Sequence, residues 1–138
     1  MIFMANEAVI IELLGIDRGR PIRYACADNT TILKGTLMEL TGDRTVSANT
    51  NDNAPVVGIA AHEKVADDGA ISISVYTNGI FDMLSDAGTD VVGTLMANSA
   101  TENTIQTADA ADLLQNSYIG YYLEAGTNAG TEAVRINK

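Results

Sequence analysis

The residue types that most often perform chemistry are sparse in this chain. Among its 138 residues there is one histidine, His62, and one cysteine, Cys26. His62 and Glu63 begin like the metalloprotease motif HExxH, but position 66 is an alanine, so the second zinc ligand is missing. The single cysteine excludes an intrachain disulfide and a cysteine-built zinc site. We therefore expect a solvated or hydrogen-bonded His62 and a buried, unreactive thiol at Cys26.

Two further segments have the composition of cation-binding loops. Asn49, Asn51 and Asn53 have the spacing of an EF-hand loop, but the chain has alanine where that loop requires a glycine and a bidentate acid. The run 67–69, Asp-Asp-Gly, is ordinary chemistry for a turn between strands. No GxSxG elbow, Walker loop or dinucleotide fingerprint occurs. The sequence therefore predicts no catalytic residue, no metal site and no cofactor, and we expect the protein not to be an enzyme.

Basic side chains that could contact a partner lie near the amino terminus. Arg18, Arg20 and Arg23 place three guanidinium groups within six residues, with no acid between them. Guanidinium groups form strong paired hydrogen bonds with carboxylates. Two interpretations remain open: these arginines pair with acidic groups on a partner, or they lie in a solvated turn.

The net charge of −10 is unevenly distributed. Residues 1–34 hold four bases and four acids, whereas residues 35–138 hold four bases and fourteen acids. Such an acidic body would be repelled by phosphate groups, so we expect no nucleic-acid partner. No stretch approaches the roughly 20 apolar residues of a membrane span, and the run Val9–Ile11 is followed by an acid and has no basic leader. We expect no membrane partner and no signal peptide.

The elements that would position these groups are predicted to be almost all β. Short Val and Ile runs are broken at regular intervals by Gly, Asn and Asp turns. Residues Ile71–Val75 alternate apolar and polar, as in a strand with one buried face. Asn78–Gly79 predicts a type I′ hairpin turn that joins this strand to Ile80–Phe81. One short surface helix is expected over Asp109–Gln115.

The second half of the chain resembles the first. Three pairs of short segments recur in the same order: Gly35–Met38 with Gly93–Met96 at an offset of 58, Val57–Ile59 with Ile119–Tyr121 at 62, and Ile71 and Ile73 with Val134 and Ile136 at 63. These matches predict two similar β units packed as a small barrel or sandwich. The alternative is that a meandering β domain resembles itself by composition alone.

The division of the chain follows from these patterns. Residues 1–30 contain apolar pairs without a regular period, interrupted by glycines and a proline, which favours an extended amino-terminal arm. Residues 31–138 would form the β-barrel domain, with the boundary near Asn29–Thr30. The composition of Val9–Ile11 suits a strand that is added to the sheet of a partner.

The segment from Gly35 to Met83 resembles a known family. Its markers are a strand at Leu37-Met38, a strand of small and branched residues at Val57–Ile59, and the pattern Tyr76…Gly79…Phe81. In their order and spacing these markers are similar to the small head-decoration, or capsid cement, proteins of tailed bacteriophages such as lambda. The longer carboxyl-terminal half is more similar to other capsid-linked phage proteins that have a duplicated small β-barrel.

This resemblance implies a structural virion protein that is made in the host cytoplasm and then lies on the outer surface of the capsid. Proteins of the family bind expanded heads as homotrimers at or near three-fold positions and stabilise the shell against the pressure of packaged DNA. The partners implied are the major capsid protein and further copies of this chain. The residues implied in capsid binding are those of the arm: Val9, Ile10, Ile11, Arg18, Arg20 and Arg23.

A different binding module, from a phage tail, a fibre or a surface adhesin, is the alternative function. Such a module would share the acidic body and the lack of a catalytic site. It would favour exposed aromatic clusters at loop tips, and Tyr118, Tyr121 and Tyr122 are the only candidates. Because neighbouring residues of a strand point to opposite faces, at least one of Tyr121 and Tyr122 is expected in the core.

Overall fold

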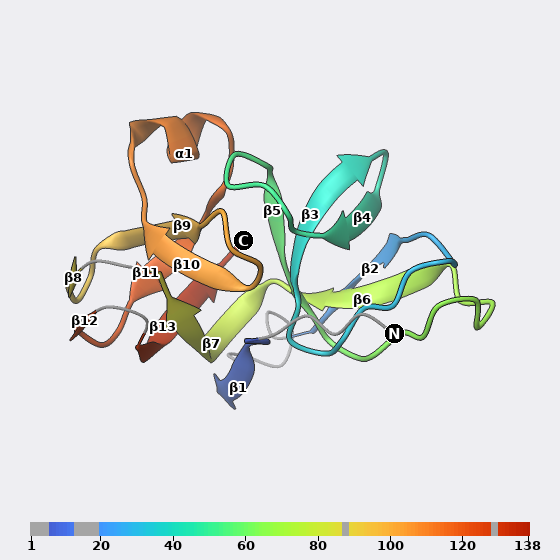
Figure 1. The fold of residues 1–138 in the computed structure, drawn as a ribbon, viewed down its shortest axis with the longest axis horizontal. Coiled ribbons are helices and arrows are strands. Elements are labelled where there is room, and N and C mark those ends of the chain that lie inside the picture. Colours follow the sequence, from blue (N-terminus) through green and yellow to red (C-terminus); the bar gives the residue numbers. More distant parts are fainter. Residues whose placement is uncertain (1–5, 13–19, 87–88, 128–129) are drawn as a thin grey trace.

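A computed structural model describes residues 6–12, 20–86, 89–127 and 130–138. The described chain is almost entirely β, as the sequence predicts, and forms two lobes that lie side by side (Figure 1). The first lobe is a closed five-stranded barrel in the order β2-β4-β3-β5-β6. Its strands are β2 (Ile22–Ala25), β3 (Leu37–Gly42), β4 (Thr45–Ala48), β5 (Val56–Ala60) and β6 (Ser72–Tyr76).

The second lobe is also a closed five-stranded barrel. Its strands follow the order β7-β10-β9-β11-β13, and β13 pairs back with β7 to close the ring. They are β7 (Asn78–Ser85), β9 (Leu95–Asn98), β10 (Thr104–Thr107), β11 (Tyr118–Tyr122) and β13 (Thr131–Asn137). Three further strands attach to this lobe: β1 (Val9–Glu12) pairs with β7, while β8 (Thr89–Asp90) and β12 (Gly126–Thr127) pair with each other. Figure 1 shows the β8–β12 ribbon at the end of the lobe that faces away from the first barrel.

The two barrels have the same topology, which confirms that the chain contains two similar β units. In each barrel one pair of strands is parallel, β2 with β4 and β7 with β10, and the other neighbouring pairs are antiparallel. The recurring Gly-Thr-Leu-Met segments occupy equivalent turns, since Gly35 and Gly93 have φ values of 90° and 85°. In both turns the threonine N–H donates to the carbonyl oxygen three residues earlier, at 3.2 Å for Thr36 and 3.1 Å for Thr94.

The hydrogen bonds between strands also correct one of the three predicted matches. The N–H of Ala61 donates to the Ser74 carbonyl oxygen, and the N–H of Leu123 donates to that of Ala133. Ser74 and Ala133 are therefore equivalent, at an offset of 59 and not 63. The match of Ile71 and Ile73 with Val134 and Ile136 was wrong, because a pattern that alternates with period two also fits when it is shifted by two or four residues.

The predicted hairpin at Asn78–Gly79 is also wrong. Both residues lie inside β7, where Asn78 pairs with Asn137 and Gly79 pairs with Ile136 of β13. Neither has the positive φ that a type I′ turn requires. The strand before them, β6, pairs with β2 and β5 of the first barrel. Asn78–Gly79 thus lies where the chain passes from one barrel to the other.

The single predicted helix is present as α1 (Ala110–Leu114). The Asp109 side chain accepts a hydrogen bond from the Asp112 N–H at 3.1 Å, and the Asp112 side chain accepts one from the Asp109 N–H at 2.8 Å. This reciprocal capping satisfies backbone donors at the start of the helix, which is why so short a helix begins at this residue. In the described part of the chain, no helix is long and apolar enough to cross a membrane.

The contact between the barrels is partly apolar and partly polar. Leu37, Val56 and Ile59 of the first barrel pack in the same buried cluster as Phe81 and the core of the second. The remaining core of the first barrel, which includes Cys26, forms a separate cluster. Since a continuous buried cluster spans both units, the barrels are expected to unfold together.

Candidate binding surface at the amino-terminal segment

The residues predicted to contact a capsid begin with β1, which is an edge strand. Val9 pairs with Asp82 and Ile10 pairs with Phe81, in an antiparallel register with β7. The register then shifts at a bulge, so that Glu12 pairs with Ile80 and Ile11 has no partner of its own. β7 is the one described strand with which β1 pairs, which leaves its other edge without a strand neighbour among the described elements.

The side chains of this strand alternate between the core and solvent. Ala8 is buried, and Ile10 packs against the core cluster that the two barrels share. Val9 and Ile11 point the other way and are 61% and 50% exposed. The structure therefore brings Val9 and Ile11 together on one outward face and separates Ile10 from them.

A close backbone contact fixes the residues that precede β1. The Ala8 N–H donates to the Gly35 carbonyl oxygen at 2.7 Å. A Cβ atom at Gly35 would lie 2.4 Å from the Ala8 carbonyl oxygen, so only glycine permits this approach. Gly35, which forms the repeated turn, therefore also provides the backbone contact that holds the amino-terminal segment against the first barrel.

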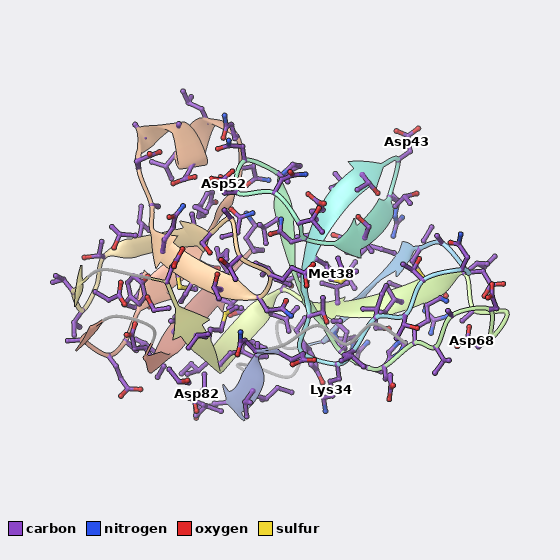
Figure 2. The ribbon with its side chains drawn as sticks, viewed as in Figure 1. Lys34, Met38, Asp43, Asp52, Asp68 and Asp82 are labelled. Atoms are coloured by element: carbon purple, nitrogen blue, oxygen red, sulfur yellow. The ribbon has the colours of Figure 1, made fainter. Side chains whose placement is uncertain are left out.

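A hollow of about 490 Å³ opens beside this contact, between the amino-terminal segment and the first barrel. Apolar atoms from Val9, Ile59 and Tyr76 line it, together with the oppositely charged side chains of Glu7 and Lys34. Figure 2 shows Lys34 at the lower side of the molecule between the two lobes, on the same side as Asp82 beside β1.

The predicted arginines do not join this surface as one group. Arg23 lies on β2 in the first barrel, where its Nη1 donates to the Ser72 hydroxyl oxygen at 3.3 Å. Arg20 is exposed just before that strand, and Arg18 lies outside the described residues. Because Ile22–Ala25 is a barrel strand, the amino-terminal arm as predicted includes a strand that the first barrel needs for closure. The boundary near residue 30 itself stays a prediction.

The other residues considered from the sequence have structural contacts. His62 Nε2 lies 3.2 Å from the Ser74 N–H, and its Nδ1 lies 3.2 Å from the Glu63 carbonyl oxygen. Those distances fit a neutral ring that donates through Nδ1 and accepts at Nε2. Among the described residues, no three histidine, cysteine or acidic side chains are grouped in a way that could hold a metal ion. Cys26 is buried with a free thiol, as expected, and burial raises the pKa of this thiol.

Two of the three asparagines with EF-hand spacing, Asn49 and Asn51, contribute instead to the contact between the barrels. Asn49 is buried, and its side-chain oxygen accepts a hydrogen bond from Asn98 Nδ2 of the second barrel at 3.0 Å. The same Asn98 nitrogen donates to the Asn51 carbonyl oxygen at 2.6 Å. The side-chain oxygen of Asn103 also accepts from the Leu37 N–H at 2.9 Å. These hydrogen bonds form a polar contact between the barrels, which the sequence pattern alone did not reveal.

A buried lysine was also missed by the sequence reasoning. Lys64 is 2% exposed and donates to the carbonyl oxygens of Asp28, Thr30 and Val65 at 2.6, 3.2 and 3.3 Å. The carboxylates of Asp28 and Asp68 lie 3.7 and 3.5 Å from its nitrogen. The lysine therefore holds together two loops at one end of the first barrel. The Asp-Asp-Gly run that includes Asp68 is a turn, as predicted.

The comparisons with known proteins give a likeness of fold. No family profile matches the chain, and no curated protein matches its sequence. Among solved structures, the fold is similar to that of the N base of the head fiber protein gp8.5 of bacteriophage phi29, with a TM-score of 0.53 and 13% sequence identity. The match covers 85% of this chain and 92% of the phi29 chain, so it includes parts of both barrels. The lambda-type decoration family is not confirmed, and the comparison shows a likeness of fold to this phage head-fiber base.

Proposed function

We propose that the chain is a structural protein of a bacteriophage virion that binds the outer surface of the head. The observation that carries this proposal is the likeness to a phage head-fiber base over 85% of the chain. In its finer form, the protein binds the expanded capsid as a homotrimer at or near three-fold positions and stabilises the shell against packaged DNA. Its partners would be the major capsid protein and further copies of itself.

The distribution of charge supports a role on an exterior surface. Most exposed acids lie on loops that project from the barrels, and Figure 2 shows Asp43 and Asp68 at outer loop tips of the first barrel. Surfaces of one sign repel each other, which keeps a displayed protein solvated and discourages aggregation of particles. The same repulsion argues against nucleic acid as a partner.

The amino-terminal segment supplies a plausible means of attachment. The edge of β1 that has no neighbour among the described strands can accept a strand of the capsid protein, while Val9 and Ile11 offer apolar side chains on the outward face. One such contact is small, but three arms in a trimer would multiply weak contacts into strong avidity. If the acceptor forms only in the expanded shell, each site stabilises that state by about 2.7 kcal/mol at a hundredfold excess over Kd.

A second candidate function follows from the nature of the structural neighbour. The phi29 protein is described as the base of a head fiber. This chain would then be the base module that attaches a fibre to the head, in place of a cement protein that covers the lattice. Electron microscopy of decorated heads separates the two, because a cement protein occupies many lattice sites whereas a fibre base carries a projecting rod.

Co-sedimentation with the expanded and immature heads of the phage that encodes the chain tests the general proposal. Binding to expanded heads alone is the expected result. Binding to neither form contradicts a head protein, and equal binding to both contradicts selectivity for the expanded shell. A truncation of the first 23 residues is unsuitable as a variant, since it removes half of β2 and would open the first barrel.

Point variants test the role of β1 without that loss. The double variant V9S/I11S changes two exposed side chains and should leave the fold intact. If about half of each side chain becomes buried on the capsid, its loss weakens binding by about 1 kcal/mol per residue, or roughly 30-fold in Kd for the pair. The matched control is V65S/I71S, in which the residues are 50% and 68% exposed on the first barrel. Equal affinity of the two double variants would exclude β1 as the attachment site.

A further inference from the structure

One corner of the second barrel, formed around Asp90 and Glu132, is polar, whereas the equivalent corner of the first barrel is apolar. In the first barrel, Cys26, Ile32, Ala60 and Ile73 are buried together in one apolar cluster. The isolated bridge between Ile32 and Lys64 corresponds to the pairing of Asp90 with Gly126 in the second barrel. Three equivalent backbone hydrogen bonds give the other matches: Ser85 for Cys26, Tyr122 for Ala60 and Glu132 for Ile73. Two buried isoleucines are thus replaced by two buried acids.

The acidic pair is enclosed by protein. Asp90 and Glu132 are 4% and 2% exposed. Ser85 Oγ donates to Asp90 Oδ2 at 2.5 Å. Neither carboxyl oxygen of Glu132 accepts a hydrogen bond from an N–H or hydroxyl donor, and the hydroxyl of Tyr122 is also buried without a partner, so the remaining candidate to share a proton with Glu132 is the neighbouring carboxyl group of Asp90. A buried carboxylate with no partner is strongly disfavoured, so the ionised form of Glu132 is at a disadvantage here.

The neighbouring charges make ionisation less favourable still. Burial, the neighbouring Asp90 and then Glu124, which are both acids, together raise the pKa of Glu132 to about 7. Glu124 follows β11, and its carboxylate accepts a hydrogen bond from the Ala133 N–H at 2.7 Å. Burial also raises the pKa of Tyr122, so this phenol stays neutral and adds no compensating charge. The groups that face Glu132 from β7, β8 and β11 are therefore neutral or negative.

A bound cation is a poorer solution for this corner than a proton. Gly126 of the β8–β12 ribbon lies so close that an added Cβ atom would be 1.6 Å from Glu132 Oε1. A calcium ion needs six to eight oxygen ligands at about 2.3–2.6 Å, and two carboxyl groups with two hydroxyls reach the lower limit only if all their oxygens converge on one point, which the close approach of Gly126 to Glu132 opposes. A proton needs only one donor and one acceptor, and two adjacent carboxyl groups provide both.

We propose that Asp90 and Glu132 share one proton in the folded protein, and that its loss loosens the β8–β12 ribbon that closes the outer end of the second barrel. Asp90 belongs to the ribbon, and Gly126 of the same ribbon rests on Glu132. Two negative charges in this corner would repel each other and draw in water, which the ribbon can admit by opening locally. The second barrel thus carries a pH-sensitive end that the first barrel lacks.

The direction and size of the effect follow from linkage. A carboxyl group whose folded pKa is raised binds more protons in the folded than in the unfolded state, so stability falls as pH rises from about 4.5 towards 7. Between about pH 5.5 and about pH 8.5, the folding equilibrium constant should fall about 30-fold through this one group. Above that range the loss levels off, because the group is ionised in both states.

Chemical denaturation at these two pH values in the presence of a chelator tests the proposal with the wild type and E132Q. The amide of E132Q cannot ionise, so it should abolish the roughly 30-fold component that the wild type shows. The matched control is E124Q, which removes an exposed acid from the same corner and should retain most of the pH dependence. Hydrogen exchange of the ribbon amides should accelerate with pH in the wild type by more than base catalysis predicts, and not in E132Q.

Three outcomes would overturn the proposal. The wild type and E132Q could have the same pH dependence, which would mean that Glu132 does not hold the proton. Calcium added at about pH 8.5 could restore stability and ribbon protection, which would make the corner a cation site. If E132Q does not fold, carboxyl carbon NMR of the wild type decides the matter, and the absence of any acidic side chain that titrates near neutral pH would contradict a shared proton.

Discussion

Two glycines at equivalent positions of the barrels are expected to be indispensable for packing of their strands. Gly58 of β5 and Gly120 of β11 lie directly against the next strand of their barrels. A Cβ atom at Gly58 would lie 2.1 Å from the Tyr76 carbonyl oxygen, and one at Gly120 would lie 1.7 Å from that of Arg135. The variants G58A and G120A should therefore destabilise both barrels in the same way.

The magnitude can be estimated from these distances. Ordinary contacts of a Cβ atom begin at about 3.4 Å, so the neighbouring strand would have to move by more than about 1 Å at each site. Overpacking of a tight core costs about 1–3 kcal/mol, and a clash with backbone lies at the upper end because it also breaks ladder hydrogen bonds. Gly58 has in addition a φ of 147°, which adds on the order of 1 kcal/mol for alanine. We expect a loss of about 3 kcal/mol for G120A and about 4 kcal/mol for G58A.

Urea denaturation followed by circular dichroism measures these losses against a total stability of about 5–15 kcal/mol. The control variant is G42A, since the nearest side-chain atom to a Cβ there would be Thr45 Cβ at 3.6 Å and the φ of Gly42 is not positive. G42A should change stability by less than about 1 kcal/mol. A small increase in stability is expected, because alanine lowers the conformational entropy of the unfolded chain. Values for G58A and G120A within about 0.5 kcal/mol of the wild type would refute the reasoning.

Two further substitutions test contacts that hold loops and the helix in place. K64M should destabilise the protein by on the order of 3 kcal/mol, because three backbone carbonyl oxygens lose a charged donor. K34M, which changes an exposed lysine, is the comparison in the same denaturation assay. A loss of stability below about 1 kcal/mol for K64M would show that water replaces the ammonium group. D109A should reduce stability by about 1 kcal/mol, as measured by thermal unfolding, because the helix loses its cap. D43A, at an exposed loop tip, should have no effect on stability. Equal melting temperatures of the two variants would contradict the capping role.

Several features of the fold could be read from local patterns. Turn residues at short intervals and alternation at Ile71–Val75 predicted an all-β chain, because strand periodicity and turn chemistry are properties of a few adjacent residues. The cap at Asp109 predicted the helix for the same reason. The repeated Gly-Thr-Leu-Met segment indicated the duplication, since the same turn requires a glycine at a positive φ in both barrels.

The candidate binding surface could be predicted only in part. The strand-forming character of Val9–Ile11 was evident from its composition, and the structure contains β1 at this position. That Ile10 faces the core while Val9 and Ile11 face outward depends on β7, which lies some 70 residues further along the chain. Arg23 of the same predicted arm lies instead on β2, which pairs with β6 in the first barrel.

Two features of the molecule are set by the tertiary structure alone. Asn78–Gly79 has the sequence of a hairpin turn, yet it continues a strand because β13 supplies a longer ladder than a hairpin with β6 would. Glu132 reads as a polar residue on a strand that alternates, and only the register of β13 places it in the position that Ile73 occupies in the first barrel. The sequence by itself determined that the chain is built from short strands separated by turns and that its β unit occurs twice. Which strands pair, and therefore which side chains become buried, is set by contacts between residues far apart in the chain, and no local pattern encodes them.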